Sequence, residues 1–210
     1  MSKLQLALDT LSIDECIDLL TQLDGLIDIV EIGTPFIMEE GVKVLTLLKN
    51  KFPNQKFLAD LKIADGAKIE TASALKAGAD MVTVLGLSEK QTIIDCVETA
   101  HKAGKEVLVD MLAVDDIQSK AKQLDELGVD YLCVHNGFDV QSVVASPLQE
   151  LIELKKANVK AKIAAVGGIK LNTLSEIMKL NPDLVIIGGA ITNAQDPKDV
   201  TLKMLEIIKG

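Results

Sequence analysis

The chain has 210 residues, of which 48% are hydrophobic and only 2% aromatic, and its formal net charge is −9. The length suits a single domain over residues 1–210, and the hydrophobic content excludes a disordered chain. All 22 basic residues are lysines. An acidic chain without arginine, and with almost no rings on which bases could stack, argues against nucleic-acid binding.

The cysteines and the first residues predict a cytoplasmic protein. Cys16, Cys96 and Cys133 are odd in number and have no metal-binding spacing, so we expect buried thiols in a reducing compartment. Asp9 interrupts the first apolar run too early for a signal peptide. Nowhere does the sequence contain the run of about 18 apolar residues that a membrane span requires.

Short apolar runs alternate with longer stretches of helical periodicity along the chain. The runs have the length of strands buried in a parallel sheet. They cover residues 4–8, 27–32, 56–61, 81–85, 106–109, 131–134, 162–166 and 184–187. The helical stretches cover residues 13–23, 38–50, 67–77, 89–103, 117–127, 143–157, 171–180 and 198–209.

Eight β-α units in series predict an α/β fold with eight parallel strands. Right-handed crossovers close such strands into a single-domain (β/α)8 barrel, the TIM barrel. Gly78 and Gly128 follow two of the expected helices and indicate left-handed helix ends. An open doubly wound sheet is the alternative, but it requires a topological switch point. The even spacing of the eight units favours the closed barrel.

Polar residues follow the expected strands at the end where a barrel enzyme has its active site. Catalytic groups of this fold gather at the C-terminal strand ends. Five acids and one histidine stand there: Asp9, Glu31, Asp60, Asp65, Asp110 and His135. Each acid alone could be a helix cap, but their convergence on one rim predicts a site. His101 is predicted to be structural instead, because it ends a helix, where a cation is favourable.

The segment Asp60-x-Lys62-x-x-Asp65 predicts a charged cluster in the barrel mouth. Strand side chains alternate, so Asp60 and Lys62 should point the same way. A lysine among carboxylates stays protonated and can donate a proton or stabilise an anion; a structural salt-bridge cluster is the alternative. Glu31 and Asp60 end neighbouring strands and form a pocket of hard oxygen ligands, which suits Mg²⁺.

Two glycine pairs follow the last two strands, Gly167-Gly168 and Gly188-Gly189. Phosphate groups bind between these loops in barrel enzymes, because glycine lets backbone N–H groups approach the anion; tight turns are the alternative explanation. His135 is a candidate general acid or base. These parts together suit a phosphorylated sugar that passes through an enediolate.

The motif from Asp60 to Asp65 resembles the D-x-K-x-x-D signature of the orotidine monophosphate decarboxylase superfamily. Three further motifs narrow the resemblance, over essentially the whole chain, to its 3-hexulose-6-phosphate synthase family: Leu6-Ala7-Leu8-Asp9, Glu31-Ile32-Gly33-Thr34-Pro35 and His135-Asn136-Gly137-Phe138-Asp139. The resemblance implies a reversible, Mg²⁺-dependent aldol condensation of D-ribulose 5-phosphate with formaldehyde to D-arabino-hex-3-ulose 6-phosphate.

For this reaction we assign hypothetical roles to the rim residues. Glu31 and Asp60 hold the metal, His135 moves the C1 proton, and Lys62 stabilises the enediolate oxygen. Asp9 binds substrate hydroxyls, and the two glycine pairs hold the phosphate. The protein is expected to be a homodimer with shared sites, in which Asp65 reaches into the active site of the partner.

Three alternatives remain at this point. A related 3-keto-L-gulonate-6-phosphate decarboxylase is expected to carry arginines where this chain has Phe138 and Gly189, and a glutamate where it has Asp110. The absence of arginine favours the synthase, although the role of Asp110 stays open. The other two alternatives are an aldolase that forms an imine on Lys62, and a catalytically silent barrel that senses sugar phosphates.

Overall fold

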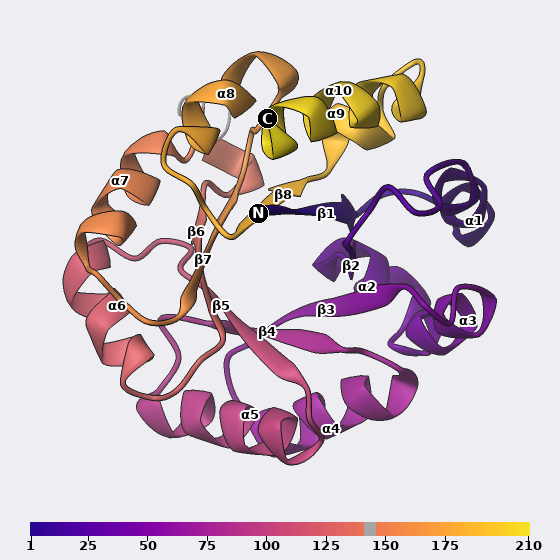
Figure 1. The fold of residues 1–210 in the computed structure, drawn as a ribbon. Helices are drawn as coiled ribbons and strands as arrows, with labels where there is room; N and C mark the ends of the chain where they lie inside the picture. Colours follow the sequence, from indigo (N-terminus) through magenta and orange to yellow (C-terminus); the bar gives the residue numbers. More distant parts are fainter. Residues whose placement is uncertain (141–145) are drawn as a thin grey trace.

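The computed structural model describes residues 1–140 and 146–210, and its eight parallel strands form a closed barrel in the order β1 to β8 (Figure 1). The (β/α)8 prediction is confirmed. The strands are β1 (Lys3–Leu8), β2 (Ile29–Ile32), β3 (Lys56–Ile63), β4 (Met81–Leu85), β5 (Glu106–Asp110), β6 (Tyr131–His135), β7 (Lys162–Val166) and β8 (Leu184–Ile187). The predicted ranges 81–85, 162–166 and 184–187 match to the residue.

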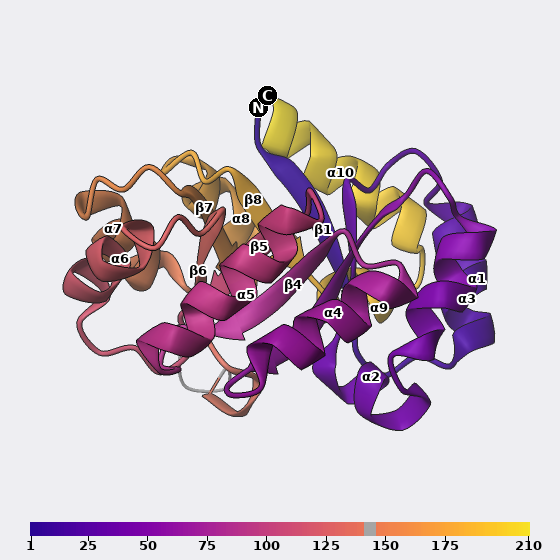
Figure 2. The same ribbon diagram turned by 90° about the horizontal axis from the view of Figure 1, so that it is seen from below.

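Helices surround the barrel and connect consecutive strands (Figure 1). They are α1 (Ile13–Gln22), α2 (Thr34–Glu40), α3 (Lys43–Lys51), α4 (Ala67–Ala77), α5 (Lys90–Lys102), α6 (Ile117–Asp125), the 3-10 helix η1 (Phe138–Val140), α7 (Leu148–Lys156), α8 (Leu171–Met178), α9 (Gly189–Thr192) and α10 (Pro197–Lys209). The two chain ends lie together at one end of the barrel, and α2 lies at the other (Figures 1 and 2). None of the described helices is long and apolar enough to cross a membrane.

Local chemistry explains several of the helix ends. Ser12 and Glu15 form a reciprocal capping box at the start of α1, which satisfies backbone N–H groups that have no partner within the helix. Gly78 ends α4 in the left-handed conformation, with φ +112°, and Gly128 after α6 also has a positive φ of +78°. Both predicted glycine stops are confirmed.

Three helix predictions need correction. The range 38–50 is two helices, α2 and α3, because Gly41 takes φ +72° and interrupts the helical backbone. The range 143–157 is observed as α7 from Leu148, directly after Pro147, while residues 143–145 lie outside the described part of the chain. The short helix α9 was not predicted at all, since its four residues are too few for a periodic signal.

The interior of the barrel changes from apolar to polar along its axis. Leu58, Met81 and Leu108 belong to an apolar cluster of inward-facing residues. Because strand side chains alternate between the two faces, the residue two positions further along each strand faces inward as well. Those next residues are polar and buried: Asp60, Thr83 and Asp110. The strands therefore deliver polar groups to the C-terminal end of an otherwise apolar barrel.

Candidate active site

The predicted rim residues gather at the C-terminal mouth of the barrel. Glu31, Asp60 and Asp110 are buried inward-facing residues of β2, β3 and β5. Asp9 directly follows β1 and His135 ends β6. The charges of Asp60, Lys62 and His135 all act on the Asp9 carboxyl. The structure thus brings six of the predicted residues together: Asp9, Glu31, Asp60, Lys62, Asp110 and His135.

The Asp60 carboxylate is held from several sides. Lys62 Nζ contacts its Oδ2 atom, and the Thr34 hydroxyl donates to the same oxygen at 2.9 Å. The Thr83 hydroxyl donates to Oδ1 at 2.7 Å. Thr83 in turn accepts the backbone N–H of Lys62 at 2.8 Å. These bonds fix both the position of the carboxylate and the course of the chain beside it.

Lys62 reaches Asp60 for a different reason than the one predicted. The pairing of β3 with β4 shifts register between Ala59 and Ile63, and Lys62 has φ +46°, which is unusual for a residue with a Cβ atom. Regular strand alternation therefore does not continue from Asp60 to Lys62. The prediction that the two side chains lie together is confirmed, but the alternation argument behind it was wrong.

Lys62 is held in its charged form. Partial burial acts to lower the pKa of its ammonium group, but the charge of Asp60 and the bond to it outweigh burial, and the pKa is raised. The Asp110 carboxylate, whose Oδ2 lies 3.8 Å from Lys62 Nζ, acts in the same direction. Imine formation requires a neutral amine, so this environment opposes an imine-forming aldolase.

The carboxyls of Glu31 and Asp9 are in surroundings that disfavour their charged form, and both pKa values are raised. Burial, followed by the charge of Asp60, raises the pKa of Glu31 well above its ordinary value, although a hydrogen bond from Gln5 opposes the shift. Gln5 Nε2 donates to Glu31 Oε2 at 2.5 Å. Burial and the charge of Asp60 also raise the pKa of Asp9. The mouth therefore contains more carboxylate charge than Lys62 alone can balance.

The donor set at this end fits a hard divalent cation. Glu31 and Asp60 offer carboxylate oxygens from neighbouring strands, and their mutual repulsion is what a cation would relieve. Among the described residues there is no group of three or more His, Cys, Asp or Glu placed to hold a metal. Two carboxylates suit Mg²⁺, which commonly keeps several waters and binds substrate oxygens.

Asp110 and His135 form a pair of the kind that orients a catalytic imidazole. His135 Nδ1 lies 2.8 Å from Asp110 Oδ2 and 3.0 Å from Oδ1. The backbone N–H of Leu112 also donates to Asp110 Oδ1, at 2.9 Å. A proton on Nδ1 engaged with the carboxylate leaves Nε2 as the basic nitrogen. The sequence had left the role of Asp110 open, and the geometry places it behind His135.

The two glycine pairs end neighbouring strands, because Val166 of β7 pairs with Ile186 of β8. Gly167 and Gly168 both have positive φ, +106° and +65°. A Cβ atom on Gly167 would lie 2.3 Å from the Asn136 carbonyl oxygen, so this position admits only glycine. Gly188 precedes α9, whose first-turn N–H groups have no acceptor within the helix. In both loops, another group can therefore approach the backbone closely.

Asp65 differs from the other predicted residues because it is exposed and directly precedes Gly66, the residue before α4. A groove of about 380 Å³ runs between α2 and α4 and reaches Asp60. Its walls include two exposed apolar side chains, Met38 at 81% exposure and Ile69 at 78%. Asp65 thus lies on the exposed connection between β3 and α4, and α4 forms one wall of this groove.

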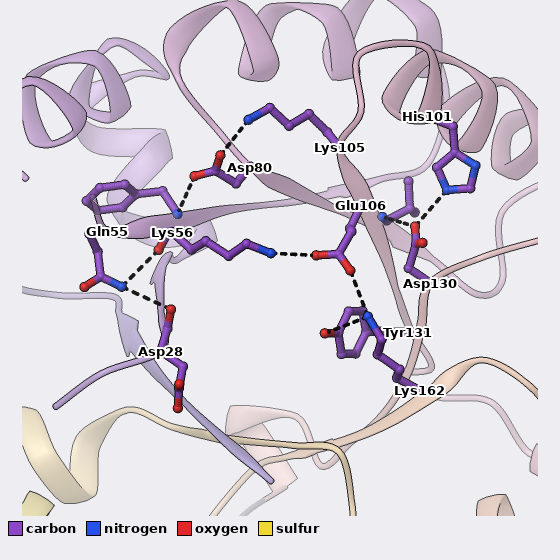
Figure 3. Close-up of polar contacts among 12 residues, drawn as sticks. Asp28, Gln55, Lys56, Asp80, His101, Lys105, Glu106, Asp130, Tyr131 and Lys162 are labelled. Carbon is purple, nitrogen blue, oxygen red and sulfur yellow. Dashed lines mark hydrogen bonds and ion pairs between the residues drawn. The ribbon is translucent and has the colours of Figure 1, made fainter. Parts of the chain in front are cut away.

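His101 lies outside the site, as predicted. It belongs to the last turn of α5, and its Nε2 atom lies 2.9 Å from Asp130 Oδ2. Figure 3 shows this pair among the charged contacts at the N-terminal end of the barrel. The same Asp130 oxygen accepts the backbone N–H of Val107 at 2.8 Å, so the contact ties α5 to two strands.

Sequence reasoning missed Gln5, Gly33, Thr34 and Thr83. Gln5 and Thr83 are single polar residues at inward-facing positions of apolar strand runs, and that pattern was a usable signal. Gly33 and Thr34 stood in a quoted motif without a role. A Cβ atom on Gly33 would lie 2.0 Å from Asp9 Oδ1, so this glycine makes room for the Asp9 carboxylate.

A closed (β/α)8 barrel with these groups at its C-terminal mouth belongs to the barrel enzymes. The chain is a member of the Orotidine 5'-phosphate decarboxylase / HUMPS family, whose model matches residues 2–204. It is 48% identical over 206 residues to a 3-hexulose-6-phosphate synthase of Bacillus subtilis, covering 98% of each chain. It is 46% identical to 3-hexulose-6-phosphate synthase 3 of Staphylococcus saprophyticus, covering 99% of each chain. The crystal structure of 3-hexulose-6-phosphate synthase from Salmonella typhimurium matches with a TM-score of 0.96 and 42% identity, covering 99% of this chain and 98% of that one.

Proposed function

We propose that this protein catalyses the reversible aldol condensation of D-ribulose 5-phosphate with formaldehyde to D-arabino-hex-3-ulose 6-phosphate. The observation that carries the proposal is the 48% identity, over 98% of both chains, to a relative named for this activity. The site geometry supports it, because a protonated lysine, an oriented histidine and crowded carboxylates lie in one mouth. An enediolate requires such a combination of base and charge stabilisation.

Glu31 and Asp60 would hold Mg²⁺ in this proposal. When bound, the ion would neutralise negative charge that develops on neighbouring substrate oxygens. Thr34 and Thr83 keep the Asp60 carboxylate in place through their hydroxyl groups. The Asp9 carboxylate packs against Gly33, where a Cβ atom would clash with it. Asp9 would accept hydrogen bonds from substrate hydroxyls.

His135 would act as the base. With Nδ1 engaged by Asp110, its Nε2 removes a proton from C1 of ribulose 5-phosphate, and the electron pair of the C–H bond forms the enediolate. The ammonium of Lys62 stabilises the enediolate oxygen. C1 then forms a bond to the formaldehyde carbon, and the proton held by His135 returns to the new alkoxide. The loops at Gly167-Gly168 and Gly188-Gly189 would hold the phosphate through backbone N–H groups.

The active enzyme would be a homodimer with shared sites. The groove between α2 and α4 exposes Met38 and Ile69 beside Asp60, and exposed apolar patches commonly mark protein interfaces. A two-fold partner on this groove would place Asp65 of each chain near the site of the other. The three cysteines are free and buried, which suits the proposed cytoplasmic location.

The decisive experiment follows ¹³C-formaldehyde by NMR with ribulose 5-phosphate and metal-stripped protein. Formaldehyde should be consumed into a labelled hexulose phosphate only after Mg²⁺ is added, and EDTA should stop the reaction. Release of CO₂ from 3-keto-L-gulonate 6-phosphate, without formaldehyde consumption, would instead assign the decarboxylase. Full formaldehyde turnover in excess EDTA would contradict the metal assignment alone.

A further inference from the structure

Gln5 is a buried amide in the apolar middle of the barrel. Its side chain is fully buried, and it shares the inward face of β1 with Ala7, two residues further along. The inward-facing residues of strands β3, β5 and β7 in the same part of the barrel are Leu58, Leu108 and Ala164. An amide is therefore inserted where every other odd-numbered strand supplies an aliphatic side chain.

Only half of this amide is satisfied. Gln5 Nε2 donates to Glu31 Oε2 at 2.5 Å, whereas Gln5 Oε1 has no hydrogen-bond partner within the described ranges. Burying a polar atom without a partner opposes folding. An apolar side chain of similar length would fill the same space without that cost, so packing alone does not explain a glutamine here.

What Gln5 provides is a donor beneath a site carboxylate. Glu31 is buried, and Asp60 and Asp9 both place negative charge beside it. The 2.5 Å hydrogen bond from Gln5 Nε2 restricts rotation of the Glu31 side chain, as hydrogen-bond partners behind metal ligands generally do.

We propose that Gln5 is a positioning residue that holds the Glu31 carboxylate oriented toward the barrel mouth, so that it can bind Mg²⁺. The amide engages Oε2 from below and leaves the other carboxylate oxygen to the cation. This inference rests on the proposed function, because it assumes that Glu31 is a metal ligand. It adds to it a residue, Gln5, that itself contacts neither the metal nor the substrate.

The test measures Mn²⁺ binding directly, from the electron paramagnetic resonance signal of the free ion in titrations of metal-stripped protein. Gln5→Met removes the donor while keeping an unbranched side chain of similar length, and Gln5→Leu is the second variant. Leu108→Met is the matched control, because it changes an inward-facing residue of β5 in the same part of the barrel as Gln5. Melting temperatures without metal report on the fold of each variant.

Gln5→Met should weaken Mn²⁺ binding about 10- to 100-fold, the usual effect of losing a group behind a metal ligand. Its melting temperature without metal should stay close to that of the wild type, because removal of the unpartnered Gln5 Oε1 offsets the lost hydrogen bond to Glu31. The Leu108→Met control should bind Mn²⁺ as the wild type does. In turnover assays the Mg²⁺ concentration for half-maximal rate should rise by the same factor as the Mn²⁺ dissociation constant.

The possible failures are distinguishable. A wild-type protein that binds no Mn²⁺ overturns the metal assignment and the role of Gln5 together. Wild-type binding that persists unchanged in Gln5→Met overturns the role of Gln5 alone. If both Gln5 variants fail to fold, or if Leu108→Met weakens binding equally, the residue serves the barrel interior in general and the positioning role is wrong.

Discussion

The two ends of this barrel use the same residue types in opposite ways. At the N-terminal end, Asp80 and Glu106 each pair with two lysines (Figure 3). Asp80 accepts from Lys105 at 2.6 Å and from Lys49 at 2.9 Å. Glu106 similarly accepts from Lys56 and Lys162, both at 2.9 Å. Burial acts to raise the pKa of both carboxyls, but the lysine bonds outweigh it and lower each one.

At the C-terminal end the ratio is reversed. Lys62 is the lysine that faces Asp9, Glu31, Asp60 and Asp110. The pKa of Asp60 is lowered, because its bonds to Lys62, Thr83 and Thr34 outweigh burial, whereas those of Glu31 and Asp9 are raised. Balanced charge stabilises one end, and excess negative charge at the other suits the cation and the substrate proposed to bind there. That difference should be visible in matched variants.

The largest effect is expected at the imidazole. His135→Gln should slow exchange of the C1 proton of ribulose 5-phosphate about 10²- to 10⁴-fold, the usual contribution of a positioned base. The exchange is measured by NMR in D₂O without formaldehyde. Asp110→Asn should slow it less, because Nε2 remains but is poorly oriented. Unchanged exchange in His135→Gln would move the base to another group, with Asp110 the first candidate.

A matched pair of aspartates tests the two ends directly. Asp60→Asn should lower kcat about 10²-fold or more, because under the proposed function it removes a charge that acts in the transition state. Asp80→Asn makes the same chemical change at the N-terminal end and should leave kcat within about two-fold, as expected for a stability position on that face. Equal activity losses in the two variants would show that the ends are not functionally separate.

Sequence reasoning found the barrel and most of its mouth because both follow from local patterns. The strand at 81–85 is a short apolar run that the sequence alone reveals. An acid at the end of such a run, like Asp110, can also be recognised from the sequence. The β3 irregularity at Lys62 was not visible, because it depends on pairing with β4 and on the Thr83 hydroxyl. The contact of Gln5 with Glu31 likewise depends on the register between two strands 26 positions apart.

The third prediction tests whether a partner chain contributes a residue to the active site at the C-terminal end. Asp60→Ala and Asp65→Ala homodimers should each be nearly inactive if Asp65 acts in the neighbouring site. Refolded together in equal amounts, they should recover roughly a quarter of wild-type activity, since half the dimers are mixed and two-fold symmetry leaves one intact site in each. No recovery, despite mixed dimers seen by mass spectrometry, would place Asp65 in the site of its own chain.

A smaller effect, on the unfolding free energy alone, is expected when the pH is lowered. Because the pKa of folded Asp80 is lowered, its stabilisation is present above about pH 4, the unfolded value, and is lost as pH falls through the folded value. Asp80→Asn should therefore cost about 1–2 kcal/mol of unfolding free energy at pH 7, allowing for solvent screening. Urea unfolding at pH 7 and pH 3 measures this difference, which should shrink at pH 3; a constant difference would contradict the ion-pair explanation.

The most direct test compares Glu31→Gln with Glu106→Gln, one identical change at each end, by urea unfolding at pH 7 and by turnover. Because the folded pKa of Glu31 is raised, Glu31 opposes folding at pH values above its unfolded pKa, whereas the lowered folded pKa of Glu106 means that its charge favours folding there. Glu31→Gln should thus abolish turnover while keeping or increasing the unfolding free energy. Glu106→Gln should keep turnover and lose about 0.2–1 kcal/mol of unfolding free energy, the range for solvent-exposed ion pairs. A Glu31→Gln protein that stays active, or that is destabilised more than Glu106→Gln, would contradict the division of the barrel into a stabilising end and a reactive one.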